Sequence, residues 1–205
     1  MTTYYRNEYL FSEIYLQEIT QQPEDTEILA SLTTLKEYRE FAWTATIQEW
    51  KESFVHEVLY ALRFNIKAEN ERLTLLYPVG NTETPLTLCY VLLPTEDLDN
   101  TTMGQNWAEK VIRSLRHHNL KWGLLTNGEQ WRIYHLDEST PYEIFLEINL
   151  AAILSNSASQ AYQIFHKFMK VENFTTGEQG QCRLDVFKKE SLAKIDYIES
   201  ELANA

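Results

Sequence analysis

The sequence predicts an α/β fold in which helices flank a mixed central sheet. Segments with apolar residues at helical spacing alternate with short strand-like runs. Leu86 to Leu93 is apolar at nearly every position, which is typical of an interior strand covered by helices on both faces. Lys121 to Tyr134 has the pattern of two strands joined at Asn127-Gly128, a dipeptide that supplies the positive φ angles of a tight hairpin turn. We therefore expect Leu86 to Leu93 in the middle of the sheet and the hairpin beside it.

The composition indicates one globular unit. The chain has 205 residues, of which 44% are hydrophobic and 13% aromatic, enough to bury a single sizeable core. Within residues 1–205 we expect a helical cap over 1–45, an α/β core over 46–150 and a helical connector over 151–205.

The net charge and the spacing of the cysteines limit the classes of possible partner. A net charge of −12 argues against a general polyanion binder, although it leaves room for a local basic groove. Cys89 and Cys182 lie far apart without metal-ligand spacing, so we expect reduced thiols and no zinc site. No apolar run approaches the ~20 residues of a membrane span. These observations favour a cytoplasmic protein with no membrane partner.

Two amphipathic helices are predicted near the N-terminus. The first lies within residues 7–20 and should end at Gln21-Gln22-Pro23, and its apolar residues are Tyr9, Leu10, Ile14, Leu16 and Ile19. The second should begin near Glu24, and its apolar residues are Ile28, Leu32, Leu35 and Tyr38. We expect these helices to cap the core. The alternative is that the acidic helices from Tyr4 to Ala42 dock a partner protein.

The remaining elements follow in order along the chain. A helix over residues 47–64 places Trp50, Phe54, Val58, Leu59 and Leu62 on one face, and strand-like sequence follows at Asn65. Strands are predicted at Leu73 to Val79, Leu86 to Leu93 and Glu143 to Ile148, with a helix over residues 105–119 before the hairpin. From Ala151 onward the pattern is helical, ending in a helix from Leu184 to Leu202.

The stretch KWGLLTNGEQWRIY, Lys121 to Tyr134, resembles the hairpin of the nuclease-like N-terminal domain in type I restriction subunits and type IIG restriction-modification enzymes. Type IIG enzymes also open on a segment similar to Leu10, Phe11, Ser12, Tyr15 and Leu16. The predicted order of helix, strand, strand, helix, strand, strand is the core order of the PD-(D/E)xK nucleases. The resemblance implies a restriction-endonuclease-like fold, DNA as a partner and contacts with restriction-modification subunits. The chain contains no methyltransferase motif.

A PD-(D/E)xK site needs an Asp and, on the neighbouring strand, an (Asp/Glu)-x-Lys motif, in which alternate residues place the carboxylate and the ammonium on one face. The carboxylates hold Mg²⁺, which polarises the phosphate and activates water. Alignment on Pro94 puts Val91 and Leu93 at the motif positions, and a shift by one residue puts Tyr90 and Leu92 there. We therefore expect a catalytically inactive module that needs no cofactor and acts through binding or as a structural part.

The enzyme alternative is a Mg²⁺-dependent endonuclease whose catalytic residues lie elsewhere. Its candidate carboxylates are Glu57, on the helix where the resemblance implies an acidic residue, Glu71 before a strand and Glu83 in a turn, with Lys67 as a distant substitute for the lysine. Each glutamate is equally typical of a solvated surface position.

A cationic run gives candidate nucleic-acid contacts at Lys110, Arg113, Arg116 and Lys121. Residues at i, i+3 and i+6 share a helix face, which should lie opposite Trp107, Val111 and Leu115. An ordinary solvated helix face is the alternative. The neighbouring His117-His118 pair lacks the i, i+4 spacing of a metal motif, so no metal site is expected.

Overall fold

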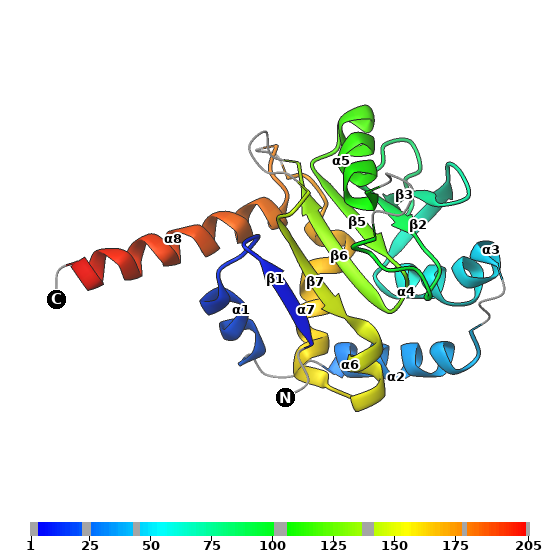
Figure 1. Cartoon of the computed structure of the whole chain (residues 1–205), viewed down its shortest axis with the longest axis horizontal. Helices are drawn as coiled ribbons and strands as arrows, with labels where there is room; N and C mark the ends of the chain where they lie inside the picture. Colours follow the sequence, from blue (N-terminus) through cyan, green and yellow to red (C-terminus); the bar gives the residue numbers. More distant parts are fainter. Residues whose placement is uncertain are drawn as a thin grey trace.

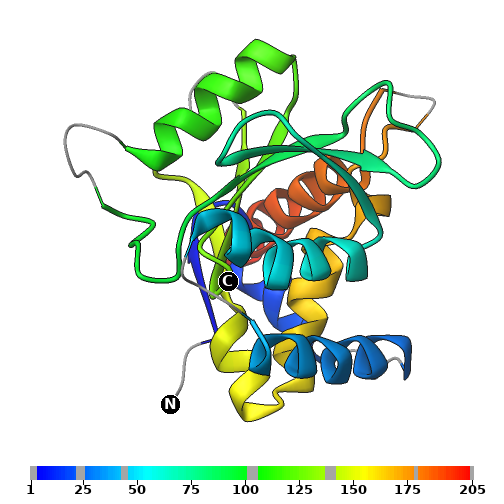
Figure 2. The ribbon, with the colours of Figure 1, turned by 90° about the vertical axis from the view of Figure 1, so that its right-hand side faces the viewer.

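The computed structural model describes residues 4–21, 26–42, 46–100, 106–136, 142–177 and 180–203, with side chains placed as far as Ile195. A seven-stranded sheet in the order β1-β7-β6-β5-β4-β3-β2 runs through the molecule, with helices on both faces (Figures 1 and 2). Strands β4 and β5 pair in parallel and the other neighbours pair antiparallel. The predicted α/β class with a mixed central sheet is confirmed.

The strands are β1 (Tyr5–Glu8), β2 (Phe64–Ala68), β3 (Leu73–Pro78), β4 (Thr87–Val91), β5 (Trp122–Thr126), β6 (Gln130–His135) and β7 (Phe145–Asn149). Strand β4 lies between β3 and β5, as predicted for Leu86 to Leu93. Its side chains alternate between two apolar clusters. Cys89 and Val91 belong to the cluster on one face of the sheet, and Leu88 belongs to the cluster on the other. Burial on both faces explains why this strand has an unbroken apolar sequence.

The helices are α1 (Glu13–Thr20), α2 (Thr26–Glu40), α3 (Ile47–Trp50), α4 (His56–Ala61), α5 (Trp107–His118), α6 (Leu150–Asn156), α7 (Ser159–Met169) and α8 (Arg183–Ala203). Helix α5 packs over β4 and β5 on one face of the sheet, whereas α4, α6 and α7 lie on the other (Figure 2). Helices α1 and α2 pack against α7, and α8 passes α1 and projects from the body (Figure 1). Among the described residues, no helix is long and apolar enough to cross a membrane.

Trp50 of helix α3 packs against the hairpin between β5 and β6. Trp122 and Trp131 are buried at 2% and 0% exposure, as predicted. Gly128 has φ +83°, and a Cβ atom there would lie 2.2 Å from Cζ2 of Trp50. The indole of Trp50 also donates a hydrogen bond from Nε1 to the Asn127 carbonyl oxygen, at 2.9 Å. Glycine is therefore required both by the turn and by the indole packed against it.

The N-terminal segment differs from the prediction. Tyr5–Glu8 forms strand β1 at the sheet edge and pairs with β7, so residues 1–45 do not form a purely helical cap. Tyr9 is 86% exposed with φ 59°, and the helix begins at Glu13 after Ser12, whose hydroxyl caps the Tyr15 amide. Four residues are too few to show the alternation of a strand, and the partner strand β7 is distant in the sequence. Residues 22–25, where the first helix was predicted to end and the second to begin, lie outside the described residues.

A further strand and a wide helical turn were not anticipated. Strand β2 precedes the two strands predicted at Leu73 and Leu86, so the order is helix, three strands, helix and then the hairpin strands. Between α3 and α4, Lys51–Val55 forms a π-helical segment, η1. The predicted apolar face is confirmed, since Trp50, Phe54, Val58, Leu59 and Leu62 are buried. The same helix also buries Lys51.

Candidate functional site

The three candidate carboxylates do not form a metal site. Glu57 lies on α4, Glu71 is exposed just before β3, and Glu83 is exposed in the connection from β3 to β4. Across the described part of the chain, no group of three or more His, Cys, Asp or Glu residues is arranged to hold a metal ion. Lys67 is exposed on the edge strand β2. The described residues therefore offer no ready ligand set for Mg²⁺.

The strand pair β3 and β4 has apolar or uncharged side chains where the nuclease motif would stand. Thr74 pairs with Cys89 across the two strands, and both residues are fully buried. Val91 lies on the same face as Cys89, two residues further along β4. Burial raises the pKa of the Cys89 thiol to about 12, so this thiol stays protonated and unreactive at neutral pH.

Lys51 faces this strand pair, and sequence reasoning missed it. Its side chain is 1% exposed, and its Nζ donates to the Glu71 carbonyl oxygen at 3.1 Å. Burial lowers the pKa of Lys51, and the negative charges of Glu52 and Glu71 act in the opposite direction. Among the described residues, Thr74 Oγ1 has no hydrogen-bond partner. The face where nuclease carboxylates would lie thus holds an ammonium group bonded to a backbone oxygen.

The predicted basic residues of α5 form a surface together with an arginine from the sheet. Arg113 and Arg116 are exposed. Lys110 does not lie opposite Trp107 as predicted, because its Nζ sits 4.3 Å from the centre of that indole ring. The guanidinium of Arg72, just before β3, is 5.0 Å from the same ring. Burial lowers the pKa of Lys110, and the charges of Arg72 and Arg113 lower it further, so three cations converge here.

We define the α5 basic face as Arg72, Lys110, Arg113 and Arg116. Glu96 neutralises part of it, with its Oε2 2.7 Å from Nη1 of Arg72. Lys121 lies beyond the helix and pairs with Asp185 of α8 at 3.8 Å. Arg72 could have been found only through the fold, because it is distant from α5 in the sequence and reaches it through the sheet.

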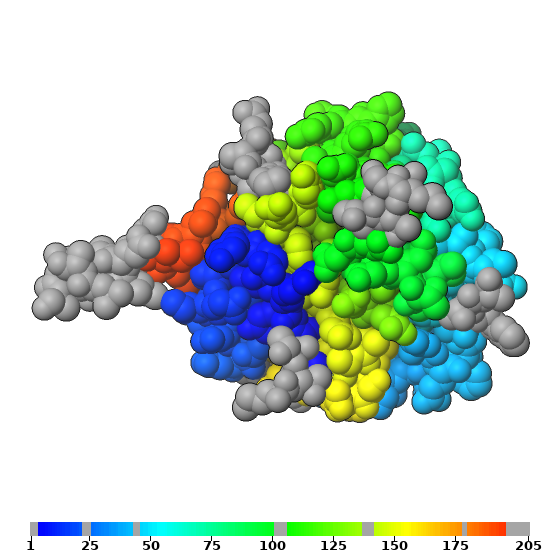
Figure 3. Space-filling view, in the orientation of Figure 1, coloured from blue at the N-terminus to red at the C-terminus, as the bar shows by residue number. Residues whose placement is uncertain are grey.

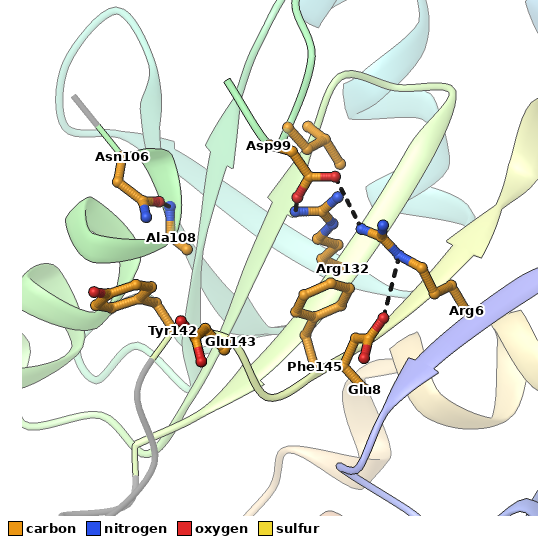
Figure 4. Close-up of a pocket in the computed structure, with 10 residues that line it drawn as sticks. Arg6, Glu8, Asp99, Asn106, Ala108, Arg132, Tyr142, Glu143 and Phe145 are labelled. Atoms are coloured by element: carbon orange, nitrogen blue, oxygen red, sulfur yellow. Dashed lines mark hydrogen bonds and ion pairs between the residues drawn. The ribbon is translucent and has the colours of Figure 1, made fainter. Parts of the chain in front are cut away.

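A second polar region lies on the α5 face of the sheet, beside β1, β6 and β7. A pocket of about 390 Å³ opens there. The residues that line it are Arg6, Glu8, Leu98, Asp99, Asn106, Ala108, Arg132, Tyr142, Glu143 and Phe145 (Figure 4). In the space-filling view, the N-terminal segment, the residues around β7 and the connection that precedes α5 meet on this side of the molecule (Figure 3).

Strand register explains why these side chains converge. Arg6 of β1 pairs with Glu147 of β7, which pairs with Arg132 of β6. In the next row on the same face, Glu8 pairs with Phe145, which pairs with Tyr134. Helix α5 packs over β4 and β5, so this end of the face is left to polar residues and to the connection that carries Asp99.

Two arginines share two carboxylates in this region. Arg132, whose side chain is 3% exposed, places Nε 2.5 Å from Oε2 of Glu147 and Nη1 2.8 Å from Oδ1 of Asp99. Arg6 places Nη2 3.1 Å from Oδ2 of Asp99 and 3.4 Å from Oε2 of Glu147. Both guanidinium groups also lie over the ring of Phe145. The four charges form a neutral quartet in which Asp99 and Glu147 each bridge the two arginines.

The electrostatics of the quartet follow from burial and pairing. Burial alone would raise the pKa of Asp99, but the hydrogen bonds and charges of Arg132 and Arg6 outweigh it and lower that pKa. Burial would lower the pKa of Arg132, and Asp99 together with Glu147 raises it instead. Burial raises the pKa of Tyr134 to about 12, although the charge of Arg132 acts in the opposite direction. The Tyr134 hydroxyl also interacts with the guanidinium of Arg132, which adds to the effect of Asp99 and Glu147 on that guanidinium.

No family model matches the chain, and neither do the curated proteins or the solved structures that were compared with it.

Proposed function

We propose that this protein is a restriction-endonuclease-like module that does not cleave DNA with Mg²⁺ and acts instead by binding, as part of a restriction-modification-type system. The order α4, β2, β3, β4, α5, β5, β6, with β4 and β5 parallel, supports this proposal because it is the order expected of a PD-(D/E)xK core with one additional strand, β2. The resemblance of Lys121 to Tyr134 to restriction subunits supports it independently.

The observation that carries the proposal is the filled face of β3 and β4. The motif positions are Val91 with Leu93 or Tyr90 with Leu92, and none of these side chains is a carboxylate or an amine. Val91 and Leu92 are fully buried, as are Thr74 and Cys89 beside them. A hydrated Mg²⁺ ion requires oxygen ligands and keeps several waters, for which a packed apolar strand provides neither ligands nor space. Lys51 in front of these strands adds a positive charge, which further disfavours a cation.

The α5 basic face supports a nucleic-acid contact. Arg72, Lys110, Arg113 and Arg116 gather cations in a protein of net charge −12. So few phosphate contacts predict weak binding without sequence preference. The logarithm of affinity should fall against the logarithm of salt concentration with a slope of roughly −2 to −4, at about −0.9 per neutralised phosphate.

The binding test is charge reversal with a matched control. Arg113→Glu combined with Arg116→Glu should abolish detectable binding of a short DNA duplex at low salt, measured by fluorescence anisotropy. Lys36→Glu combined with Lys189→Glu makes the same change in net charge on α2 and α8, and should leave binding nearly unchanged. Equal losses from both pairs would mean that net charge alone is sensed. An absence of binding by the unmodified protein would favour docking of a restriction-modification subunit through the acidic N-terminal helices.

One observation favours the endonuclease alternative. Lys51 binds the Glu71 carbonyl oxygen, and the carboxylates of Glu52 and Glu71 are close enough to influence its pKa. A lysine with two carboxylates nearby is a minimal set for activating water beside a metal ion. Plasmid nicking with Mg²⁺ or Mn²⁺ that was lost on Glu71→Gln, and retained on Glu83→Gln, would establish this activity and overturn the binding proposal.

A further inference from the structure

The first part of helix α8 packs against the body of the protein. Phe187 is buried, and its ring lies 6.2 Å from the ring of Tyr15 on α1. Further along the helix, Lys194 pairs with Glu18, also on α1. The helix then continues as far as Ala203 and projects from the body (Figure 1). Its contact with α1 is therefore made by its first part.

Two apolar side chains of α8 are exposed to water where the helix leaves the body. Leu192 is 51% exposed and Ile195 is 39% exposed. At about 100° per residue, positions three apart lie about 60° from each other around the helix, so these two side chains form one patch. In the sequence, Ile198 and Leu202 follow Ile195 at the spacing of a continuing helix face. The sequence thus predicts an apolar stripe that begins with this patch, and covering such a stripe stabilises a helix.

The charges of α8 are divided between its two parts. From Arg183 to Lys194 the sequence has four cationic and two acidic residues, a formal charge of +2. From Ile195 to Ala203 it has three acidic residues and no cationic one, a formal charge of −3. The three acidic residues are Asp196, Glu199 and Glu201. The helix is therefore basic where it packs on the body and acidic where it projects.

This charge distribution makes α8 complementary to a second copy of itself. In an antiparallel pair, the basic part of each helix lies beside the acidic part of the other, whereas a parallel pair brings like charges together. A two-fold axis applies the same patch from both subunits, so a single self-complementary helix satisfies both halves of the interface. The apolar patch of each copy is then covered by the other helix.

We propose that α8 pairs in antiparallel orientation with α8 of a second copy of this chain, and that Leu192 and Ile195 of both copies are buried in the contact. One helix from each subunit makes a small interface, so the association is weak. Its charges lie at the rim in contact with water, so the association weakens as salt is added. The proposal is independent of the proposed function, because it uses no residue of the α5 basic face or of β3 and β4.

The first experiment measures the oligomeric state by analytical ultracentrifugation at low salt. The wild-type chain should form a dimer between about 1 μM and about 1 mM, the range expected of a small interface. Leu192→Glu and Ile195→Glu should each weaken the dimer at least about tenfold, because a carboxylate would be buried in an apolar contact. All of these positions are exposed in the single chain, so the variants should keep the wild-type denaturant midpoint.

Val186→Glu is the matched control on the same helix. Val186 is 40% exposed and precedes Ile195 by nine residues, which places it about half a turn around α8 from the patch. This variant makes a similar change in charge and polarity and should leave the dimer intact. A wild-type chain that stays monomeric over the whole concentration range would overturn the proposal. Equal weakening by the Val186 variant would overturn it as well.

The second experiment tests the orientation of the pair. Glu199→Lys combined with Glu201→Lys gives the second part of α8 the same sign as the first, so an antiparallel dimer should weaken at least about tenfold at low salt and much less at high salt. Glu40→Lys combined with Glu83→Lys makes the same change in net charge at exposed positions outside α8 and should have little effect. A parallel pair would instead become tighter in the α8 variant, because its repelling acidic parts would be nearly neutralised. Tighter association, or no change, would therefore overturn the antiparallel arrangement.

Discussion

Lys51 and Arg132 are both buried cations in contact with the central sheet, yet the protein accommodates them differently. Lys51 is 1% exposed, and its Nζ donates a hydrogen bond to one backbone oxygen. Arg132 is 3% exposed at its side chain and binds two carboxylates. The pKa of Lys51 is lowered by burial, whereas that of Arg132 is raised by its partners. Burial makes Lys51 easier to deprotonate than a solvated lysine, whereas the partners of Arg132 hold it charged.

The difference follows from what each region of the sheet can supply. Helices cover both faces at the centre of the sheet. Lys51 therefore donates its hydrogen bond to a backbone carbonyl, and the carboxylates of Glu52 and Glu71 interact with it only electrostatically. The side formed by β1, β6 and β7 is open to a pocket and brings in carboxylates from β7 and from the connection before α5. Lysine can lose its proton when buried, and arginine cannot. The open side therefore holds the arginine and its partners.

Replacing Arg132 should have the largest effect. Arg132→Met leaves Glu147, which is 7% exposed, without its main partner, so unfolding free energy should fall by about 3–5 kcal/mol. The measurement is the denaturant midpoint. Arg63→Met is the control, because Arg63 also pairs with two carboxylates, Glu27 and Glu172, but on the surface. Its loss should cost less than about 1 kcal/mol. Comparable losses from both variants would show that the buried pairs of Arg132 stabilise the fold no more than the surface pairs of Arg63.

His56 should produce a smaller effect that depends on pH. Burial and the nearby charge of Lys51 lower its pKa to about 4, from 6.5 in the unfolded chain. Between pH 6.5 and 4 the His56 imidazole is protonated in the unfolded state and neutral in the folded state. The free energy of unfolding therefore falls as the pH falls through this window. His56→Gln should remove about 2 kcal/mol of that loss.

The control for this measurement is His117→Gln, on an exposed position of α5. Another half-buried histidine, His166, also has a lowered pKa and contributes to the same window, so the acid dependence should shrink without disappearing. An unchanged slope between pH 6.5 and 4 in the His56 variant would show that this imidazole is protonated in the folded protein.

Replacing Lys51 should have the smallest effect and the opposite sign from Arg132. Lys51→Met removes a buried charge at similar volume, so the protein should gain about 1 kcal/mol at pH 7. The unfolded state binds more protons than the folded state between the lowered pKa of Lys51 and its ordinary value of 10.5, so wild-type stability rises with pH in that range. The gain should therefore diminish toward pH 10. Lys67→Met, on exposed β2, should change little, and a loss of stability in the Lys51 variant would show that its ammonium is well solvated.

Much of the fold could be predicted because its signals are local. The apolar run of β4 reflects burial on both faces, and the Asn127-Gly128 turn fixed the hairpin. Strand β1 could not be recognised, because four residues at a sheet edge have no periodicity of their own and acquire strand geometry from β7. The acidic helices from Tyr4 to Ala42 were likewise predicted as a helical cap although Tyr5–Glu8 belongs to the sheet.

The two polar regions were harder to predict from the sequence than the fold, although some of their residues have a recognisable pattern. Arg132 and Glu147 are single charges within the apolar strands WRIY and FLEI, a pattern that indicates a buried pair. Asp99 could not have been assigned to them, since its connection has no regular pattern. Lys51 follows Trp50 on a helix and resembles a surface residue until the π-helical segment turns it toward the sheet. Arg72 and Trp107 meet through tertiary contact alone.

The pairing of β1 with β7 has a consequence for how the chain reaches its native state. Arg6 and Glu147 are 141 residues apart and form neighbouring positions of one sheet. Contacts at such separation form late, because closing a long loop costs entropy before the contact stabilises anything. During synthesis β1 leaves the ribosome before the other strands of this sheet, and it is therefore among the last of them to be placed. Until it arrives, β7 presents an unpaired edge on which another nascent chain could add its own strand.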